Sequence, residues 1–360
     1  MFARLLAWAQ KNERHLGATA FLFGFITDLL TFGLLDIAYV NLFFLGYLGL
    51  ASFSTFGSHI LFARRSEGQS KLERGLAILL SLAAQYAIGG ILSGMLIFYT
   101  KSATLSVSWP FIALLTLVFI GNEFFRKYRE HLIFQTALLF FALYAYTIFA
   151  VPIYVNALGP WVFLGSTLLA IAVFVLFLWL LAKGGATRLR ESLRAILVTA
   201  SITVFVVVGS YFTGVLPPLP LTLREGGIYH GLERRGGEYV LLAEAPKPWW
   251  NLRTQVVHLA PSESATAFAS VFAPVRFSTS VVHHWEHYSP AEKKWTDQGR
   301  IVFGISGGRG GGYRGYSEKS NLAPGRWRVT IETLEGLAIG RIGFTVERVP
   351  APPALHEEVH

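Results

Sequence analysis

The sequence predicts an all-α transmembrane bundle of about seven helices, followed by a small all-β, sandwich-like C-terminal domain. Three observations support this division. Charged residues form 15% of the chain, whereas a soluble domain usually carries about 25%. The deficit lies in the first part, because residues 1–221 hold 15 Lys and Arg with 8 Asp and Glu, and residues 222–360 hold 16 and 14. The first part consists of long apolar runs, and the second of short alternating ones.

Seven apolar stretches in the first part are long enough, or nearly so, for a bilayer-spanning helix of about 20 residues. They cover residues 16–35, 40–62, 75–99, 105–121, 132–155, 159–181 and 195–216. The fourth is the weakest, because it is short and carries a proline, Pro110, near its start. We therefore predict one transmembrane domain over residues 1–216, whose first helix stays attached as a signal anchor.

The basic residues alternate from loop to loop. Those before the first helix and after the second, fourth and sixth number 14, whereas the other loops hold only Lys101. Because Lys and Arg favour the cytoplasmic side, we predict a cytoplasmic N-terminus and a C-terminal domain on the opposite side. The lipid bilayer is then the partner of the helices, and the net charge of +9 does not indicate a nucleic-acid partner.

One acidic residue, Asp28, lies well within a predicted span and is the intramembrane polar candidate. One hypothesis assigns it to a proton- or ion-coupled site. The other gives it a hydrogen bond to a neighbouring helix, for example at Asn41, and we prefer it because no Lys or Arg accompanies Asp28 in the spans. Broken helices and internal repeats, which are typical of transporters, are not clear in this sequence.

The second part begins with Pro217, Pro218 and Pro220, which end the last helix. We predict a linker and juxtamembrane segment over residues 217–264. Its Trp249 and Trp250 either lie at the lipid headgroups or pack against the next domain. Short strands with turn residues between them then predict an antiparallel sandwich over 265–349, with a tail at 350–360. The expected strands are 266–272, 280–288, 300–305, 313–319, 326–333 and 338–348.

Several motifs in this domain resemble a known module. They are His283-His284-Trp285, the segment from Arg314 to Lys319, the segment from Pro324 to Val329, and Gly343 to Val346. In this order they resemble the C-terminal module called domain of unknown function 2914, over residues 268–347, although the Gly-rich stretch 307–312 departs from it. That module occurs in bacterial proteins, often behind several membrane helices, and has no assigned activity. With the charge pattern, the resemblance implies a bacterial inner (cytoplasmic) membrane protein with a periplasmic β domain.

The resemblance also implies a set of candidate binding residues, namely His283, Arg314, Ser317 and Lys319. Arginine, serine and lysine side chains together hold a carboxylate, a phosphate or an acidic sugar. On an extended strand Arg314 points away from Ser317 and Lys319, so a single site needs a bulge after the preceding glycines. The alternative is that Arg314 pairs with Glu318 or Glu286, and that Lys319 is a solvated charge on an edge strand.

Metal and cofactor sites are not expected. His283 and His287 share one strand face but lie about 13 Å apart, which is too far for one ion. We instead predict that Trp285 and Trp327 fill the core and that the histidines lie at the surface. The glycines at 307–312 lack the Gly-Lys-Ser/Thr ending of a phosphate loop and predict a hairpin loop. The chain has no Cys, which excludes disulfides and thiolate metal sites.

Three functions fit these features. The first is a binding or sensing protein of the cell envelope, whose β module contacts an anionic envelope component or an envelope protein. The second is a transporter or flippase with an accessory β domain. The third, a membrane-bound enzyme of envelope assembly, is disfavoured because no paired carboxylates or nucleophile–base constellation is evident. We therefore predict no catalytic residues and prefer the first function.

Overall fold

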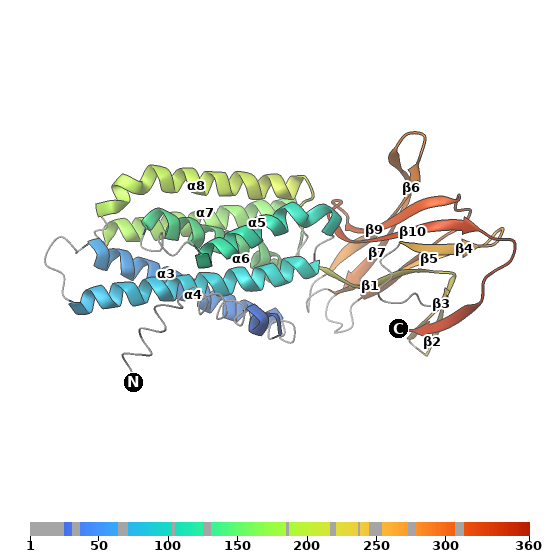
Figure 1. The fold of residues 1–360 in the computed structure, drawn as a ribbon, viewed down its shortest axis with the longest axis horizontal. Coiled ribbons are helices and arrows are strands. Elements are labelled where there is room, and N and C mark those ends of the chain that lie inside the picture. The colour runs from blue at the N-terminus through green and yellow to red at the C-terminus, as the bar shows by residue number, and fades with distance from the viewer. Residues whose placement is uncertain are drawn as a thin grey trace. The chain divides into compact units, whose positions relative to one another are not determined.

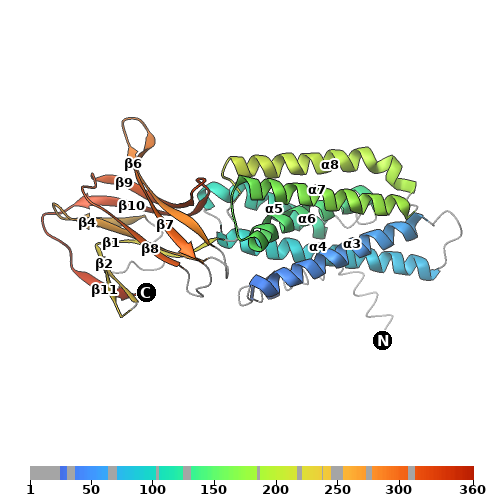
Figure 2. The ribbon, with the colours of Figure 1, turned by 180° about the vertical axis from the view of Figure 1, so that it is seen from behind.

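The computed structural model describes residues 25–30, 37–63, 71–102, 105–124, 131–184, 187–216, 221–236, 238–244, 254–272, 278–306 and 313–360. The chain divides into two compact units, one built mainly of helices and the other mainly of strands. Figures 1 and 2 show the elements of each unit from two opposite sides.

The helical unit confirms the predicted seven helices in the N-terminal part, counted over the described residues. A helical segment at 25–30 belongs to the first predicted span, and the rest of that span lies outside the described residues. The six long helices are α3 (Ile37–Ala63), α4 (Lys71–Ser102), α5 (Leu105–Phe124), α6 (Leu132–Val155), α7 (Pro160–Lys183) and α8 (Thr187–Phe212). By length and composition, α3, α4, α6, α7 and α8 are apolar enough to cross a membrane. The apolar stretch of α5 is shorter, at Ser108–Asn122, as the sequence predicts for this helix.

The helices differ in how much of their surface is buried within the protein. The most deeply buried of the five is α6, which is apolar all round. The least buried is α8, and Phe205 on it is 80% exposed. Trp161 on α7 is 85% exposed. Apolar exposure on this scale is unusual in soluble proteins and fits helices whose outer surfaces contact lipid.

The strand unit contains eleven strands in the described residues. They are β1 (Thr222–Tyr229), β2 (Gly231–Arg235), β3 (Glu238–Glu244), β4 (Gln255–Leu259), β5 (Ala265–Phe272), β6 (Ser278–Ser289), β7 (Lys294–Ser306), β8 (Tyr313–Lys319), β9 (Gly325–Thr333), β10 (Ala338–Arg348) and β11 (Leu355–Val359). The first sheet has the order β1-β5-β8, the second β4-β10-β9-β6-β7 and the third β11-β3-β2. All described pairs are antiparallel except β4 with β10. Strands β5 to β10 match the six predicted strands.

Five strands lie where the sequence predicts none. Four of them, β1 to β4, fall within residues 217–264, and β11 falls within 350–360. The local pattern is weak because β1 contains two adjacent glycines, and β2 and β11 are rich in charge. Hydrogen bonding to neighbouring strands stabilises these segments as strands despite the weak pattern, since β1 pairs with β5, and β11 and β2 pair with β3. Trp249, Trp250 and the glycines at 307–312 lie outside the described residues.

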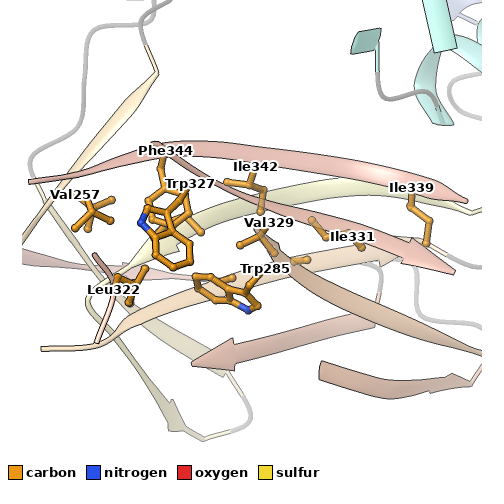
Figure 3. Packing of buried hydrophobic residues seen from close by; sticks show 14 of the residues in the cluster. Val257, Trp285, Leu322, Trp327, Val329, Ile331, Ile339, Ile342 and Phe344 are labelled. Atoms are coloured by element: carbon orange, nitrogen blue, oxygen red, sulfur yellow. The ribbon is translucent and has the colours of Figure 1, made fainter. Parts of the chain in front are cut away.

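The first and second sheets share one hydrophobic core (Figure 3). Trp285 of β6 and Trp327 of β9 are buried in it, which confirms the prediction for both. Small residues on β5, such as Ala267 and Ala269, leave room for these large rings. The third sheet contacts the other face of the first sheet, where Tyr239 of β3 packs on Phe268 of β5 with ring centroids 5.8 Å apart.

Candidate functional site

Two of the predicted site residues meet inside the core. The Nδ1 atom of His283 shares a hydrogen bond of 2.8 Å with Ser317 Oγ, and Trp285 Nε1 donates to the same oxygen at 3.0 Å. His283 is 0% exposed, and the ring of Phe303 lies edge-on to it at 4.8 Å. Burial lowers the pKa of His283 to about 4. This corrects the expectation of a surface histidine, and it makes the group a neutral structural contact that a ligand does not reach.

The other two predicted residues lie apart. Strand β8 pairs with β5 from Tyr313 to Lys319 without a register shift, so the expected bulge is absent. Arg314 therefore points to the face opposite Ser317, and Lys319 Nζ donates to the carbonyl of Gln298 at 2.6 Å. The predicted set His283, Arg314, Ser317 and Lys319 does not form one site. The alternative ion pairs of Arg314 are also not seen, because Arg328 binds Glu286 and Ser264 binds Glu318.

Strand β8 packs closely on Phe303 of β7 at Gly315. A Cβ added there would lie 2.2 Å from Cε2 of Phe303, so this glycine lets β7 and β8 approach closely. The bulge expected after the glycines at 307–312 is not seen in the described part of β8, where Gly315 accommodates an aromatic ring.

Within the helical unit, Asp28 lies in the segment 25–30 and its carboxylate lies near Ser93 of α4, whose hydroxyl has no partner at hydrogen-bond distance among the described residues. Neither hypothesis for Asp28 is decided by this arrangement. Further buried polar side chains join pairs of helices. The contacts are His59 to Gln135 and Gln135 to Ser81, both at 2.8 Å, Gln85 Nε2 to the Asn122 carbonyl at 2.5 Å, and Tyr144 to Thr167 at 2.9 Å.

The second sheet carries a polar network that the sequence alone does not predict. We call the face of this sheet that points away from the core the outer face. Its central contact is a bidentate ion pair, in which Arg328 Nε and Nη2 each donate a hydrogen bond of 2.6 Å to a carboxylate oxygen of Glu286. The Arg328 guanidinium lies 4.2 Å from the ring centroid of Trp295. Burial alone would raise the pKa of Glu286, but the hydrogen bonds and charge of Arg328 outweigh burial and lower it.

A second contact group surrounds His284 on the same face. Its Nε2 lies 3.4 Å from Asp297 Oδ1, and its Nδ1 lies 3.4 Å from Glu332 Oε1. Arg300 Nη2 approaches the same Glu332 oxygen at 3.7 Å. Burial raises the pKa of Glu332 despite these neighbours. Acidic and basic side chains of β7, β6 and β9 therefore contact one another on the outer face, with Glu286 and Glu332 buried and Asp297 and Arg300 exposed.

Beside this network, Gly343 of β10 leaves part of the outer face without a side chain. Gly343 is exposed and lies opposite Arg328, and a Cβ added there would contact only Thr254 Cγ2, at 4.0 Å. Arg341 lies two residues before Gly343 on β10, opposite Thr330 of β9. Burial lowers the pKa of Arg341, and the charge of Arg328 lowers it further.

Arg326 of β9 lies against aromatic rings of β6 and β7. Its guanidinium lies 5.0 Å from the ring centroid of Tyr288 and 5.9 Å from that of Trp295. Such cation–π contacts hold the side chain in place without neutralising its charge. Among the described carboxylates, none forms an ion pair with Arg326.

Another polar group joins the third sheet to the second. Glu244 of β3 accepts hydrogen bonds from the backbone N–H of His258 at 2.7 Å, from the His258 ring at 2.8 Å and from the His230 ring at 2.9 Å. These bonds lower the pKa of Glu244 even though burial opposes them. No three His, Asp or Glu side chains of the described residues are grouped so that they could hold a metal ion.

The comparisons with known proteins assign a family to one part of the chain. Residues 278–346, which contain β6 to β9 and most of β10, match the family described as protein of unknown function (DUF2914). This agrees with the resemblance that the motifs carry. No curated protein matches the chain.

Solved structures give only distant likenesses. An immunoglobulin-like protein from Pseudomonas aeruginosa is 10% identical, with 35% of this chain and 96% of that chain covered and a TM-score of 0.21. A β-glucosidase from Listeria innocua is 9% identical, with 32% and 16% covered and a TM-score of 0.20. An alkylpurine DNA glycosylase from Pseudomonas fluorescens is 9% identical, with 83% and 98% covered and a TM-score of 0.23. These TM-scores are too low to support an argument about fold or function.

Proposed function

We propose that this chain is a binding protein of the cell envelope. Its helices anchor it in the bacterial inner membrane with the N-terminus in the cytoplasm, and its β domain is a sandwich in the periplasm. Five apolar helices and the distribution of basic residues, 14 on one side and 1 on the other, support the membrane anchor and its orientation. The core shared by the first and second sheets supports the sandwich.

The binding surface in this proposal is the outer face of the second sheet. The observation that carries it is the ion pair of Arg328 with Glu286, whose side chains are only 20% and 11% exposed. The free energy lost by removing both charges from water is about as large as the free energy gained from their attraction, so such a pair adds little to stability. The pair instead holds both charged groups in one fixed geometry on the outer face, as a recognition surface requires.

The contacts within the helical unit favour an anchor over a transporter. The side chains of His59, Gln135 and Ser81 bond to one another and so join α3, α6 and α4. Polar side chains with this role hold membrane helices together. A transport pathway instead needs polar groups that face a water-filled cavity.

Single-cysteine labelling tests the binding surface directly, because the chain has no Cys of its own. Val302→Cys lies on the outer face and Val359→Cys on the third sheet, and the parent valines are 56% and 60% exposed. We expect Val302→Cys to react with a soluble maleimide more slowly in the native envelope than in purified protein. The matched control, Val359→Cys, should react equally in both. Equal rates for both variants in both preparations would exclude the outer face as the binding surface.

A further inference from the structure

We propose that a groove between α3, α6 and α7 holds one long acyl chain of a membrane lipid. This inference goes beyond the binding surface proposed for the β domain. It rests only on the part of the proposed function that places the helices in a membrane. The lining of the groove, its closed end and its depth along the helices support it.

The groove is a hollow of about 350 Å³ within the helical unit. Its rim is exposed and includes Leu45 of α3 and Val173 of α7. Its floor is buried and includes Phe174 of α7 with Leu139 and Leu143 of α6. Because α6 is the most deeply buried of the five apolar helices, the groove reaches from the outer surface of the unit to its interior.

The groove is open along α3 and closed at one end. Gly49 lines it, and a Cβ added there would have nothing within 4 Å. The same two helices approach closely where they end, because a Cβ added at Gly184, just after α7, would lie 2.6 Å from Cδ1 of Ile60 on α3. A chain in the groove therefore enters from the side on which α3 and α7 begin.

The lining favours hydrocarbon over water. Among the described residues that line the groove, Ser52 alone has a polar side chain, whereas a buried water molecule usually makes about three hydrogen bonds. An empty groove would lose the dispersion contacts of its walls. A helix of a second copy would occupy roughly 800 Å³ over the about 10 Å from Leu45 to Ser52, so it does not enter the groove. A single acyl chain is narrow enough to do so.

The depth of the groove selects a long chain. Tyr39 and Trp161 lie near the starts of α3 and α7 and are exposed, and such rings prefer the level of the lipid headgroups. Phe174 lies about 20 Å from Trp161 along the axis of α7, whereas half of the hydrocarbon core measures about 15 Å. A chain whose headgroup lies near Trp161 must therefore extend to the middle of the bilayer to reach the floor.

Photolabelling of the full chain in nanodiscs tests the groove. The probe is a phosphatidylcholine with two long acyl chains, one of which ends in a diazirine. We expect label on α6 at Leu139 or Leu143 that saturates at one probe per chain as the probe fraction rises. Label on α8 around Phe205, which is exposed, should instead rise in proportion to the probe. A didecanoyl probe with the same diazirine should label α8 and not α6, because its chains are too short for the floor.

Two variants fill the groove from α3. Gly49→Phe and Ser52→Phe should each remove the label on α6 and leave the label on α8 unchanged. The matched control is Gly165→Phe on α7, where an added Cβ also has nothing within 4 Å but the residue does not line the groove. It should leave both labels unchanged. Equal melting temperatures show that the variants keep the fold.

Four results would overturn the inference. They are label on α6 that does not saturate, label on α6 that persists in both filling variants, equal labelling of α6 by the didecanoyl probe, and disulfide-linked dimers of Gly49→Cys. The last result would assign the groove to a contact between two copies, since the chain has no Cys of its own. If α8 is labelled and α6 is not, this inference fails and the membrane anchor stands. If neither helix is labelled, the membrane anchor fails as well.

Discussion

The buried imidazole of His283 links the stability of the β domain to pH. Its pKa in the folded chain is about 4, against an ordinary value of 6.5, so the unfolded chain binds the proton first as pH falls. The stability that the neutral ring contributes is complete above about pH 6.5 and is lost as pH falls toward 4. The loss amounts to about 2 kcal/mol by pH 5.

Comparison with His283→Gln isolates this effect from the other titrating groups. Glu286 and Asp297, with lowered pKa values, also favour neutral pH, whereas Glu332 has a raised pKa and opposes them. Hydrogen exchange of the β6 and β8 peptides in the full chain measures local stability at pH 7 and pH 5. We expect a smaller drop in the variant than in the parent, and equal drops would show that His283 does not titrate as described.

At the scale of the element, β8 depends on the close approach at Gly315. Gly315→Val would place a side chain on the ring of Phe303, where even a Cβ meets Cε2 at 2.2 Å. We expect a loss of about 1–3 kcal/mol in the free energy of unfolding. Gly343→Val on β10 is the matched control, since its Cβ has an ordinary contact. Thermal melting of the two variants in detergent distinguishes them, and an equal effect would contradict the close packing of β7 on β8.

The sequence predicts those helices and strands in which the hydrophobic pattern is strong within the element itself. The helices α3 to α8 follow from long apolar runs, and β5 to β10 follow from alternation, as in Val329 and Ile331 between Thr330 and Glu332. The strands β1 to β4 and β11 depend on partners far along the chain, so their local patterns are weak. Local pattern decides an element only where it outweighs tertiary pairing.

The candidate site is harder to predict for the same reason. Alternation places Arg328, Thr330 and Glu332 on one face of β9, but it does not tell which residues of β6 lie opposite. The pairs that make the outer face, such as Glu286 with Arg328, depend on the register between strands 42 residues apart in sequence. The meeting of His283 with Ser317 likewise follows from the packing of two sheets and not from either strand alone.

For the whole molecule, the strand pairing predicts that residues 278–346 do not fold alone. This segment holds β6 to β9 and most of β10, but the strand that pairs with β8 is β5, and β4 borders β10 on its other side. Without β5 and β1, the core side of the second sheet would also face water, including Trp285 and Phe344. We expect fast hydrogen exchange throughout the isolated segment and protection of the same peptides in the full chain. Protection in the isolated segment would show that the matched region is autonomous.

The topology of the whole chain is testable with the same cysteine-free background. Arg190→Cys lies on α8 near a basic loop, and Val359→Cys lies on β11. In spheroplasts, a membrane-impermeant maleimide should label Val359→Cys and leave Arg190→Cys unlabelled until the membrane is opened. The opposite pattern would invert the proposed orientation.

The parallel pairing of β4 with β10 also orders events in time. Synthesis completes β4 at Leu259, but its partner begins only at Ala338. Among the described strands β4 is bonded to β10 alone, so each nascent chain passes through an interval in which β4 is unpaired. During that interval Val257 and Leu259, which end in the core, are available to chaperones or to aggregation. The speed of synthesis across the intervening strands therefore sets the earliest moment at which the second sheet closes.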